Sequence, residues 1–304
     1  MSIRSTLAVY RRRFARSTIE ASRWERVALY ASVLLIVLVS IFPFYWMLYT
    51  SLVPASRLYL TDPQLLLPGM TLRSPLPAVT LENYRQLLTA ETVPFIQYFI
   101  NSVVIATISA ALGLLFSIFG AYSFARLDYP GQAIFSRGVL VTYMFAGILM
   151  VIPIYQILIW LGLVNTRAGV ILTHFTFVIP LGLYMLGNFF RSIPQEIEEA
   201  ALMDGYSRLE VIVKITIPMS LPAIFAVYLY SFILSWNEYL YAKILLKDSE
   251  LYTLPIGIEN IQTAFQNVWG EVMAASILTT IPVLVMFLYL QKYLIEGLNF
   301  GSMD

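Results

Sequence analysis

The side chains that could carry chemistry or bind a partner are concentrated in one stretch, residues 191–218, between two long apolar segments. Its first half has the pattern of a short helix. Ser192 and Gln195 have the spacing of a helix cap, and Pro194 suits a first turn. Acidic residues at 196, 198 and 199 complement the positive end of a helix, and Gly205 suits the left-handed position that follows a last turn. A rigid polar helix of this kind favours docking to a partner protein, with folding back onto a nearby surface as the alternative.

A second short helix is predicted directly after the first. Ser207 and Glu210 have the spacing of a capping box, in which each side chain binds the backbone N–H of the other residue. Pro218 is expected to end the helix, and its apolar stripe consists of Leu209, Ile212 and Val213. The stretch is therefore a helix–turn–helix joined directly to two apolar segments, a geometry that transmits displacement better than a flexible loop does.

A second group of candidates, Trp236, Asn237 and Glu238, ends a long apolar segment. A carboxylate in such a segment is costly unless it faces a cavity or an interface. The group therefore either lines a solute path or gate, or Glu238 reaches lipid headgroups while Trp236 joins an aromatic belt. His174 is the only histidine. Without a second histidine or a nearby carboxylate, a buried, neutral, hydrogen-bonded imidazole is favoured over a metal site or a proton relay.

Several classes of chemistry are excluded by composition. The chain has no cysteine, so disulfides, thiolate metal sites and a cysteine nucleophile are absent. It has no Gly-x-x-x-x-Gly-Lys-Ser/Thr sequence and cannot bind ATP in the manner of P-loop motors. A net charge of +1 gives no general attraction to nucleic acid. An intramembrane enzyme would need a nucleophile and base or metal ligands at depth, which the lone histidine does not supply.

The elements that must position these residues are membrane helices. Hydrophobic residues make up 59% of the 304 positions and charged residues 12%, far from the roughly 25% charged residues of soluble domains. Crossing about 30 Å of hydrocarbon takes about 20 helical residues. Uncharged windows of sufficient length predict an all-α, polytopic membrane protein with six transmembrane helices: Val27–Ser56, Thr92–Ala125, Gly138–Thr166, Ala168–Phe190, Ile215–Asn237 and Val272–Gln291.

The distribution of basic residues sets the orientation. A cytoplasmic N-terminal tail places thirteen of the nineteen Lys and Arg residues inside, so both termini are expected in the cytoplasm. The first apolar window is too long for the core of a signal peptide, and we interpret it as an uncleaved membrane anchor. The predicted divisions are a tail over 1–26, a transmembrane domain over 27–293 with the loop 191–218, and a tail over 294–304. The second window carries small residues on one face, which predicts close helix packing: Ala106, Ala110, Gly113, Ser117 and Ala121.

The loop resembles the EAA signature of ABC importer permeases. The matching residues are Glu199-Ala200-Ala201, then Gly205, then Ile215-Thr216-Ile217-Pro218, where Ile217 departs from the usual Leu. Further segments are similar to the six-span subunit of the maltose-type carbohydrate importers: Asn101-Ser102, Leu161–Thr166, Trp236–Tyr239 and Thr253–Pro255. The resemblance covers the chain from about Val27 to the C-terminus. The tail Leu294–Gly301 matches the family tail more weakly, so a disordered tail is nearly as well supported as one that contacts the ATPases.

The resemblance implies a permease subunit of an ATP-driven importer in the bacterial inner membrane. Its loop would be a coupling helix that sits in a groove of a cytoplasmic P-loop ATPase dimer, which would bind the ATP and Mg that this chain does not. The coupling residues would be Glu199 as a charged anchor, Ala200 and Ala201 for close approach, Asp204, and Gly205 for the turn. A second related permease and an external solute-binding protein are also implied. The resemblance favours a sugar as the solute, and a polyol or glycerol phosphate would fit as well. The alternative is a secondary transporter driven by an ion gradient, which would need intramembrane charges that the six windows almost entirely lack.

Overall fold

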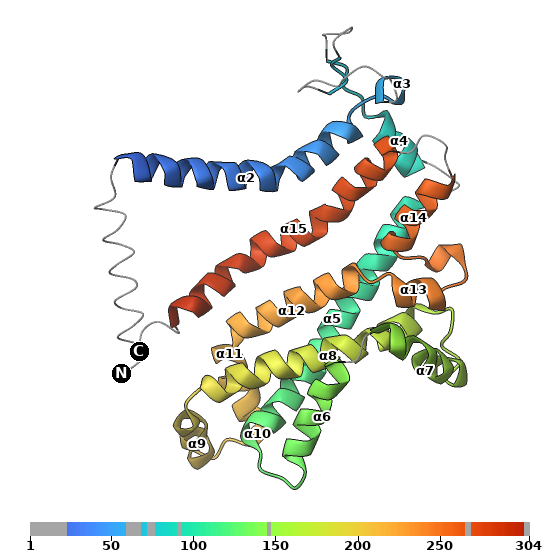
Figure 1. The fold of residues 1–304 in the computed structure, drawn as a ribbon. Coiled ribbons are helices and arrows are strands. Elements are labelled where there is room, and N and C mark those ends of the chain that lie inside the picture. Colours follow the sequence, from blue (N-terminus) through green and yellow to red (C-terminus); the bar gives the residue numbers. More distant parts are fainter. Residues whose placement is uncertain are drawn as a thin grey trace.

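The computed structural model describes residues 23–58, 68–71, 77–89, 93–144, 147–264 and 269–300, and most of these lie in helices (Figure 1). The centre of the molecule is a parallel pair, α5 (Phe95–Arg126) and α8 (Arg167–Ser192). The small residues predicted to share one face of α5 are all buried. A Cβ on Gly113 would clash with Val178, and one on Gly182 would clash with Ser117. The stripe therefore serves packing within the chain, where it brings the two backbones close together.

The fourth predicted span is α8, and a short connection leads into it. A tight turn precedes α8, with Gly162 at φ +69° and Asn165 at φ 61°. Thr166 caps α8, because its hydroxyl accepts a hydrogen bond from the Gly169 N–H at 3.0 Å. The turn is also tied to the loop after α13 (Leu240–Leu245), since the Asn165 Oδ1 accepts hydrogen bonds from the Lys247 and Asp248 N–H groups.

The third predicted span contains α6 (Gln132–Met144) and α7 (Gly147–Trp160), and residues 145–146 lie outside the described part of the chain. The predicted window began at Gly138, whereas α6 begins six residues earlier at Gln132.

The fifth predicted span is bent by 81° at Ser220. On the loop side lie α10 (Arg208–Val211), the π-helix η1 (Ile212–Thr216) and α11 (Ile217–Met219), and on the membrane side lies α12 (Leu221–Trp236). The proline in the first turn of α12, Pro222, has no N–H and crowds the preceding turn, which favours a break at this point. Pro218 was expected to end the second short helix, but the helical backbone continues one residue past it.

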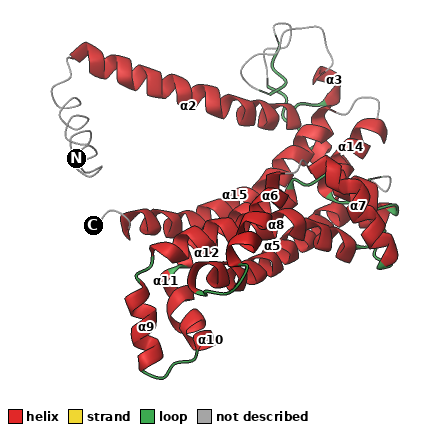
Figure 2. Cartoon of the chain, turned by 60° about the horizontal axis from the view of Figure 1, so that its bottom comes forward, coloured by secondary structure: helices red, strands yellow, loops and turns green. Residues whose placement is uncertain are grey.

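The first and last long helices lie at one side of the bundle. α15 (Trp269–Phe300) packs against α12 and α2 (Arg23–Ser51), and α2 contacts little else. Its side chains are exposed along most of its length, and it stands away from the bundle in Figures 1 and 2. The predicted C-terminal tail begins inside α15, because this helix continues to Phe300. Residues 1–22 of the predicted N-terminal tail lie outside the described residues.

The end opposite the loop carries short helices: α3 (Ala55–Leu58), α4 (Glu82–Thr89), η2 (Ser249–Leu251) and α14 (Leu254–Ala264). Of these, α4 is anchored by a buried side chain. Its Asn83 is buried and donates from Nδ2 to the carbonyls of Ser51 and Val53, which fixes α4 to the end of α2.

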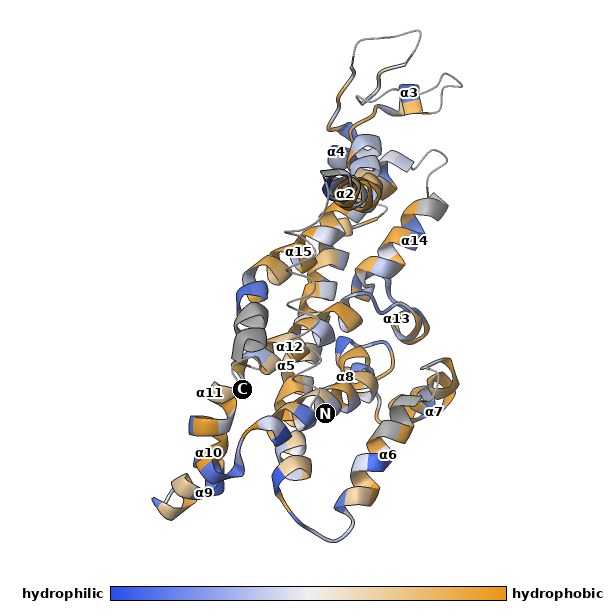
Figure 3. Cartoon of the chain, turned by 60° about the vertical axis from the view of Figure 1, so that its left-hand side comes forward, coloured by the Kyte–Doolittle hydropathy of each residue, from blue (hydrophilic) through white to orange (hydrophobic). Residues whose placement is uncertain are grey.

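The helices have the lengths and surfaces of membrane spans. Within the described residues, α2, α5, α8 and α15 are each long and apolar enough to cross a membrane, and the bent α10–α12 segment adds a fifth if it counts as one span. Hydrophobic residues dominate the long helices, and hydrophilic residues gather around α9 (Gln195–Met203) and α10 (Figure 3). The chain is an integral membrane protein.

Candidate functional site

The candidate docking element is α9, which lies beyond the end of the bundle with α10 beside it (Figures 1 and 2). The predicted helix exists, but its start is not capped as expected. Ser192 belongs to the last turn of α8, where its hydroxyl donates to the Phe189 carbonyl at 2.7 Å. Pro194 precedes the first turn of α9 without a side-chain cap. The cap prediction was wrong because α8 continues two residues farther than its apolar window.

The two faces of α9 have different surroundings. Glu198 and Ala201 are buried against the membrane domain. The opposite face is free within the described residues: Met203 is 88% exposed and Ile197 39%, and Glu199 and Ala200 are also exposed. Of the predicted coupling residues, Glu199 and Ala200 thus point away from the domain and Ala201 points into it. Asp204 and Gly205 follow the last turn.

A buried polar joint fastens α9 to the membrane domain. Arg126 Nε lies 3.0 Å from Glu198 Oε1, and both side chains are about 5% exposed. The Tyr122 hydroxyl donates to Glu198 Oε2 at 3.1 Å, and the Thr216 hydroxyl donates to Oε1 at 3.3 Å. Arg126 also donates to the Ile193 carbonyl at 2.7 Å. We call these four side chains, Tyr122, Arg126, Glu198 and Thr216, the loop joint.

The loop joint connects three elements through one carboxylate. Tyr122 and Arg126 come from the end of α5, Glu198 from α9, and Thr216 from η1. A buried charge must be paired and hydrogen-bonded, so moving Glu198 away would leave the buried Arg126 without its carboxylate partner. The Glu198 carboxylate therefore ties α9 to both α5 and η1. In the sequence, Glu198 is one of three acidic residues near the start of the helix, and nothing distinguishes it from the other two except that Arg126, a charge at the end of a span, needs a partner.

The turn after α9 and the start of α10 are as predicted. Gly205 has φ +90°, a conformation that L side chains rarely adopt. The capping box is present: the Ser207 Oγ accepts from the Glu210 N–H, and Glu210 accepts from the Ser207 N–H at 3.0 Å. The hydrogen bonds that the Glu210 carboxylate accepts from Ser207, together with the bond from the Lys214 ammonium, lower the pKa of Glu210 to about 2. The cap therefore keeps its charge at every physiological pH.

The second predicted group is not one site, because its three residues have different surroundings. Trp236 is a buried core residue, stacked on Phe232 and in edge contact with Phe99. Asn237 is exposed, and its Nδ2 donates to the Ile233 carbonyl at 2.8 Å. Glu238 turns into the protein and accepts from the N–H groups of Tyr241 and Ala242 at 2.8 and 3.0 Å. Its carboxylate thus caps the short helix α13.

His174 has a nearby carboxylate after all. Its Nε2 lies 3.6 Å from Glu238 Oε2, and its Nδ1 lies 3.2 Å from the Ser109 hydroxyl. The imidazole is 1% exposed, so the predicted burial and hydrogen bond are confirmed. The statement that no carboxylate lies near was wrong because 64 residues separate the two in sequence. His174 and Glu238 together join α5, α8 and the start of α13.

Replacement of Glu238 by alanine should destabilise the protein by loosening α13. The change leaves two buried N–H groups without acceptors, which costs about 1–3 kcal/mol each. Glu238→Gln keeps one acceptor oxygen and should be milder. The measurement is the thermal stability of the purified protein. Asn237→Ala, at the adjacent exposed position, is the control, and equal behaviour of all three variants would contradict the capping role.

Comparisons with known proteins place these features in one family. The family model described as "Binding-protein-dependent transport system inner membrane component" matches residues 23–299. The chain is 34% identical over 278 residues to Inner membrane ABC transporter permease protein YcjP of Escherichia coli (strain K12), a match that covers 91% of this chain and 96% of that protein. It is 33% identical to Trehalose/maltose transport system permease protein MalG of Thermococcus litoralis, with 92% and 97% covered.

A solved structure has a similar fold. One chain of the structure described as a bacterial ABC transporter involved in the import of the acidic polysaccharide alginate superposes on this chain with a TM-score of 0.74. The identity is 26%, and the match covers 90% of this chain and 98% of that one.

Proposed function

Because this chain belongs to the family of inner membrane components of binding-protein-dependent transport systems, and is a permease subunit of an ABC importer, we propose that α9 couples a separate ATPase to solute movement. The observation that carries the proposal is the two-faced construction of α9. One face is locked into the domain through Glu198, and the other presents Ile197, Ala200 and Met203 to the outside. An exposed apolar strip on a rigid helix is suited to a groove in a partner.

The solute in this proposal is a sugar. One relative is named for trehalose and maltose, and the similar structure is described as importing alginate. The chain supplies no ATP site, so ATP and Mg would be bound by a pair of cytoplasmic P-loop ATPases. A second related permease would complete the pathway, and an external binding protein would deliver the solute. Both termini and α9 would lie in the cytoplasm.

The absence of cysteine allows a direct test of the coupling role. A single cysteine at Ala200, on the free face of α9, should form a cross-link to the ATPase in the assembled complex. Ala133→Cys is the control, because Ala133 is also exposed and begins α6 at the same end of the bundle. A cross-link from Ala200→Cys alone supports the assignment.

A second arm of the test concerns assembly. Purification of the tagged chain from its membrane in mild detergent should recover a second permease and a P-loop ATPase, and deletion of 195–205 should release the ATPase. Recovery of the chain alone, under conditions that preserve other membrane complexes, would contradict the proposal and favour an ion-coupled carrier.

A further inference from the structure

The free surfaces of the central helix pair differ in chemistry. On α5 every strongly exposed residue in the described structure is apolar: Ile96, Ile100, Ile108, Ala111, Leu112, Leu115, Phe116 and Phe119. On α8, which packs against α5, the exposed residues beyond the first turn are mostly polar, with a gap of eight residues between the second and the third: Leu172, Thr176, Tyr184, Asn188, Arg191 and Ser192. We call this second set the α8 stripe. Lipid suits the first surface, and water or a polar partner suits the second.

The polar groups of the α8 stripe differ in how far they are satisfied within the chain. The Thr176 hydroxyl donates to the Thr173 carbonyl at 2.8 Å and the Ser192 hydroxyl to the Phe189 carbonyl at 2.7 Å, whereas the three polar side chains between them have weak partners or none among the described residues. The Tyr184 hydroxyl makes no hydrogen bond to the described part of the chain, and this side chain is 55% exposed. Asn188 only accepts, from Arg191 at a long 3.4 Å, and Arg191 reaches the Phe124 carbonyl at 3.5 Å. Tyr184 lies eight residues, about 12 Å, before the end of α8. At that depth an unpaired hydroxyl facing hydrocarbon would be costly, so an aqueous surface accounts for it better.

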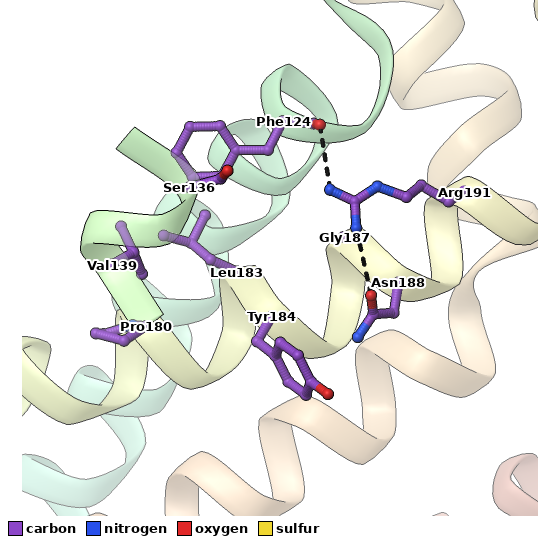
Figure 4. Close-up of a pocket in the computed structure, with 9 residues that line it drawn as sticks. All are labelled: Phe124, Ser136, Val139, Pro180, Leu183, Tyr184, Gly187, Asn188 and Arg191. Carbon is purple, nitrogen blue, oxygen red and sulfur yellow. Dashed lines mark hydrogen bonds between the residues drawn. The ribbon is translucent and has the colours of Figure 1, made fainter. Parts of the chain in front are cut away.

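The stripe borders a cavity of about 170 Å³ between α6 and α8 (Figure 4). Ser136 and Val139 come from α6, and Tyr184, Asn188 and Arg191 come from α8. Complete small-molecule sites usually measure about 300–1,000 Å³, so this cavity is smaller than a complete site. The lining combines apolar side chains with an aromatic ring and with amide, hydroxyl and guanidinium groups, a mixture that suits a sugar ring, which has apolar faces and a rim of hydroxyls. The apolar side chains are Phe124, Val139, Pro180 and Leu183.

We propose that the α8 stripe lines the water-filled translocation pathway and that the cavity at Tyr184, Asn188 and Arg191 contacts a hydroxyl-rich solute, a sugar, as it passes. The proposal rests on the importer function and adds where this subunit touches the solute. Tyr184 supplies the ring face, and Asn188 and Arg191 supply hydrogen bonds. Because the cavity is smaller than a complete site, the contact is transient and suited to passage rather than to retention.

The first test uses single cysteines in the otherwise cysteine-free chain, within the assembled complex in membrane vesicles. A charged, membrane-impermeant methanethiosulfonate reacts with a thiol that water reaches, since the thiolate is the reactive form. Tyr184→Cys and Asn188→Cys should react at least tenfold faster than Leu112→Cys and Leu115→Cys on the free face of α5. Equal, slow reaction at all four positions would overturn the proposal and assign the stripe to lipid or to a dry subunit contact.

The second test addresses the sugar. A methanethiosulfonate that carries a glucose group is applied to Ser136→Cys, which lines the cavity and leaves the three contact residues intact. Its rate should fall several-fold when Tyr184→Ala is added, whereas the rate of the charged reagent should not. An unchanged glucosyl rate would overturn the sugar contact. Neither reaction rate depends on α9. If Ala200→Cys forms a cross-link to the ATPase but these two rates do not change as expected, the pathway proposal is wrong and the proposed coupling role of α9 still holds.

Discussion

Replacement of Glu198 by alanine should abolish ATP-driven uptake, although Glu198 lies on the side of α9 that faces away from a partner. The change leaves Arg126 buried without its carboxylate and removes the acceptor for Tyr122 and Thr216. Loss of one partner from a buried ion pair costs about 3–5 kcal/mol. We expect α9 to detach from the end of α5, which should appear as rapid proteolysis within 193–216 and as loss of uptake in vesicles.

A double-mutant cycle separates this role from a general loss of stability. Arg126→Met combined with Glu198→Ala removes both charges, so the pair should be less damaging to stability than Glu198→Ala alone. Glu199→Ala, one position along on the free face, is the matched control: it should leave protease resistance unchanged even where it weakens ATPase binding. Normal uptake by Glu198→Ala would refute the loop joint as the connection between α9 and the membrane domain.

The second large effect is expected from Gly205→Asp, which should uncouple ATP hydrolysis from uptake. Gly205 has φ +90°, and a Cβ there would meet no atom within 4 Å. The effect therefore comes from the backbone, because a side chain disfavours this conformation by roughly 1–3 kcal/mol and would shift the turn between α9 and α10. The complex should still hydrolyse ATP while its transport rate falls at least tenfold.

Gly162 provides a control of the same kind. It has φ +69° and open space around its Cβ position, but it lies in the turn before α8 at the opposite end of the bundle. Gly162→Asp should carry a similar conformational cost without separating hydrolysis from transport. If both variants lose uptake and hydrolysis in proportion, the Gly205 effect is a matter of stability and not of coupling.

Local features of the loop were predictable because their causes are local. The capping box at Ser207 and Glu210 needs only residues three apart, and Gly205 is glycine because its backbone requires it. The long apolar helices follow from composition in the same way.

Features that depend on distant partners were not predictable from one sequence. Glu198 is buried because Arg126, 72 residues earlier, meets it at the end of α5, and neither position has a pattern that reports the pairing. Glu238 caps α13 and lies beside His174 for a similar reason. The group at 236–238 was treated as one site because its members are adjacent, whereas the backbone changes from helix to turn there and sends the side chains in different directions.

The separate position of α2 has a consequence for how the protein is made. Its main contact is α15, which is synthesised only after everything from Leu52 to Val268. During translation α2 must therefore remain as an isolated helix in the bilayer, held there by its apolar surface while its eventual neighbour does not yet exist. Its assembly with the bundle is a late, long-range event, in contrast to the early pairing expected for α6 through α8, which are close in sequence.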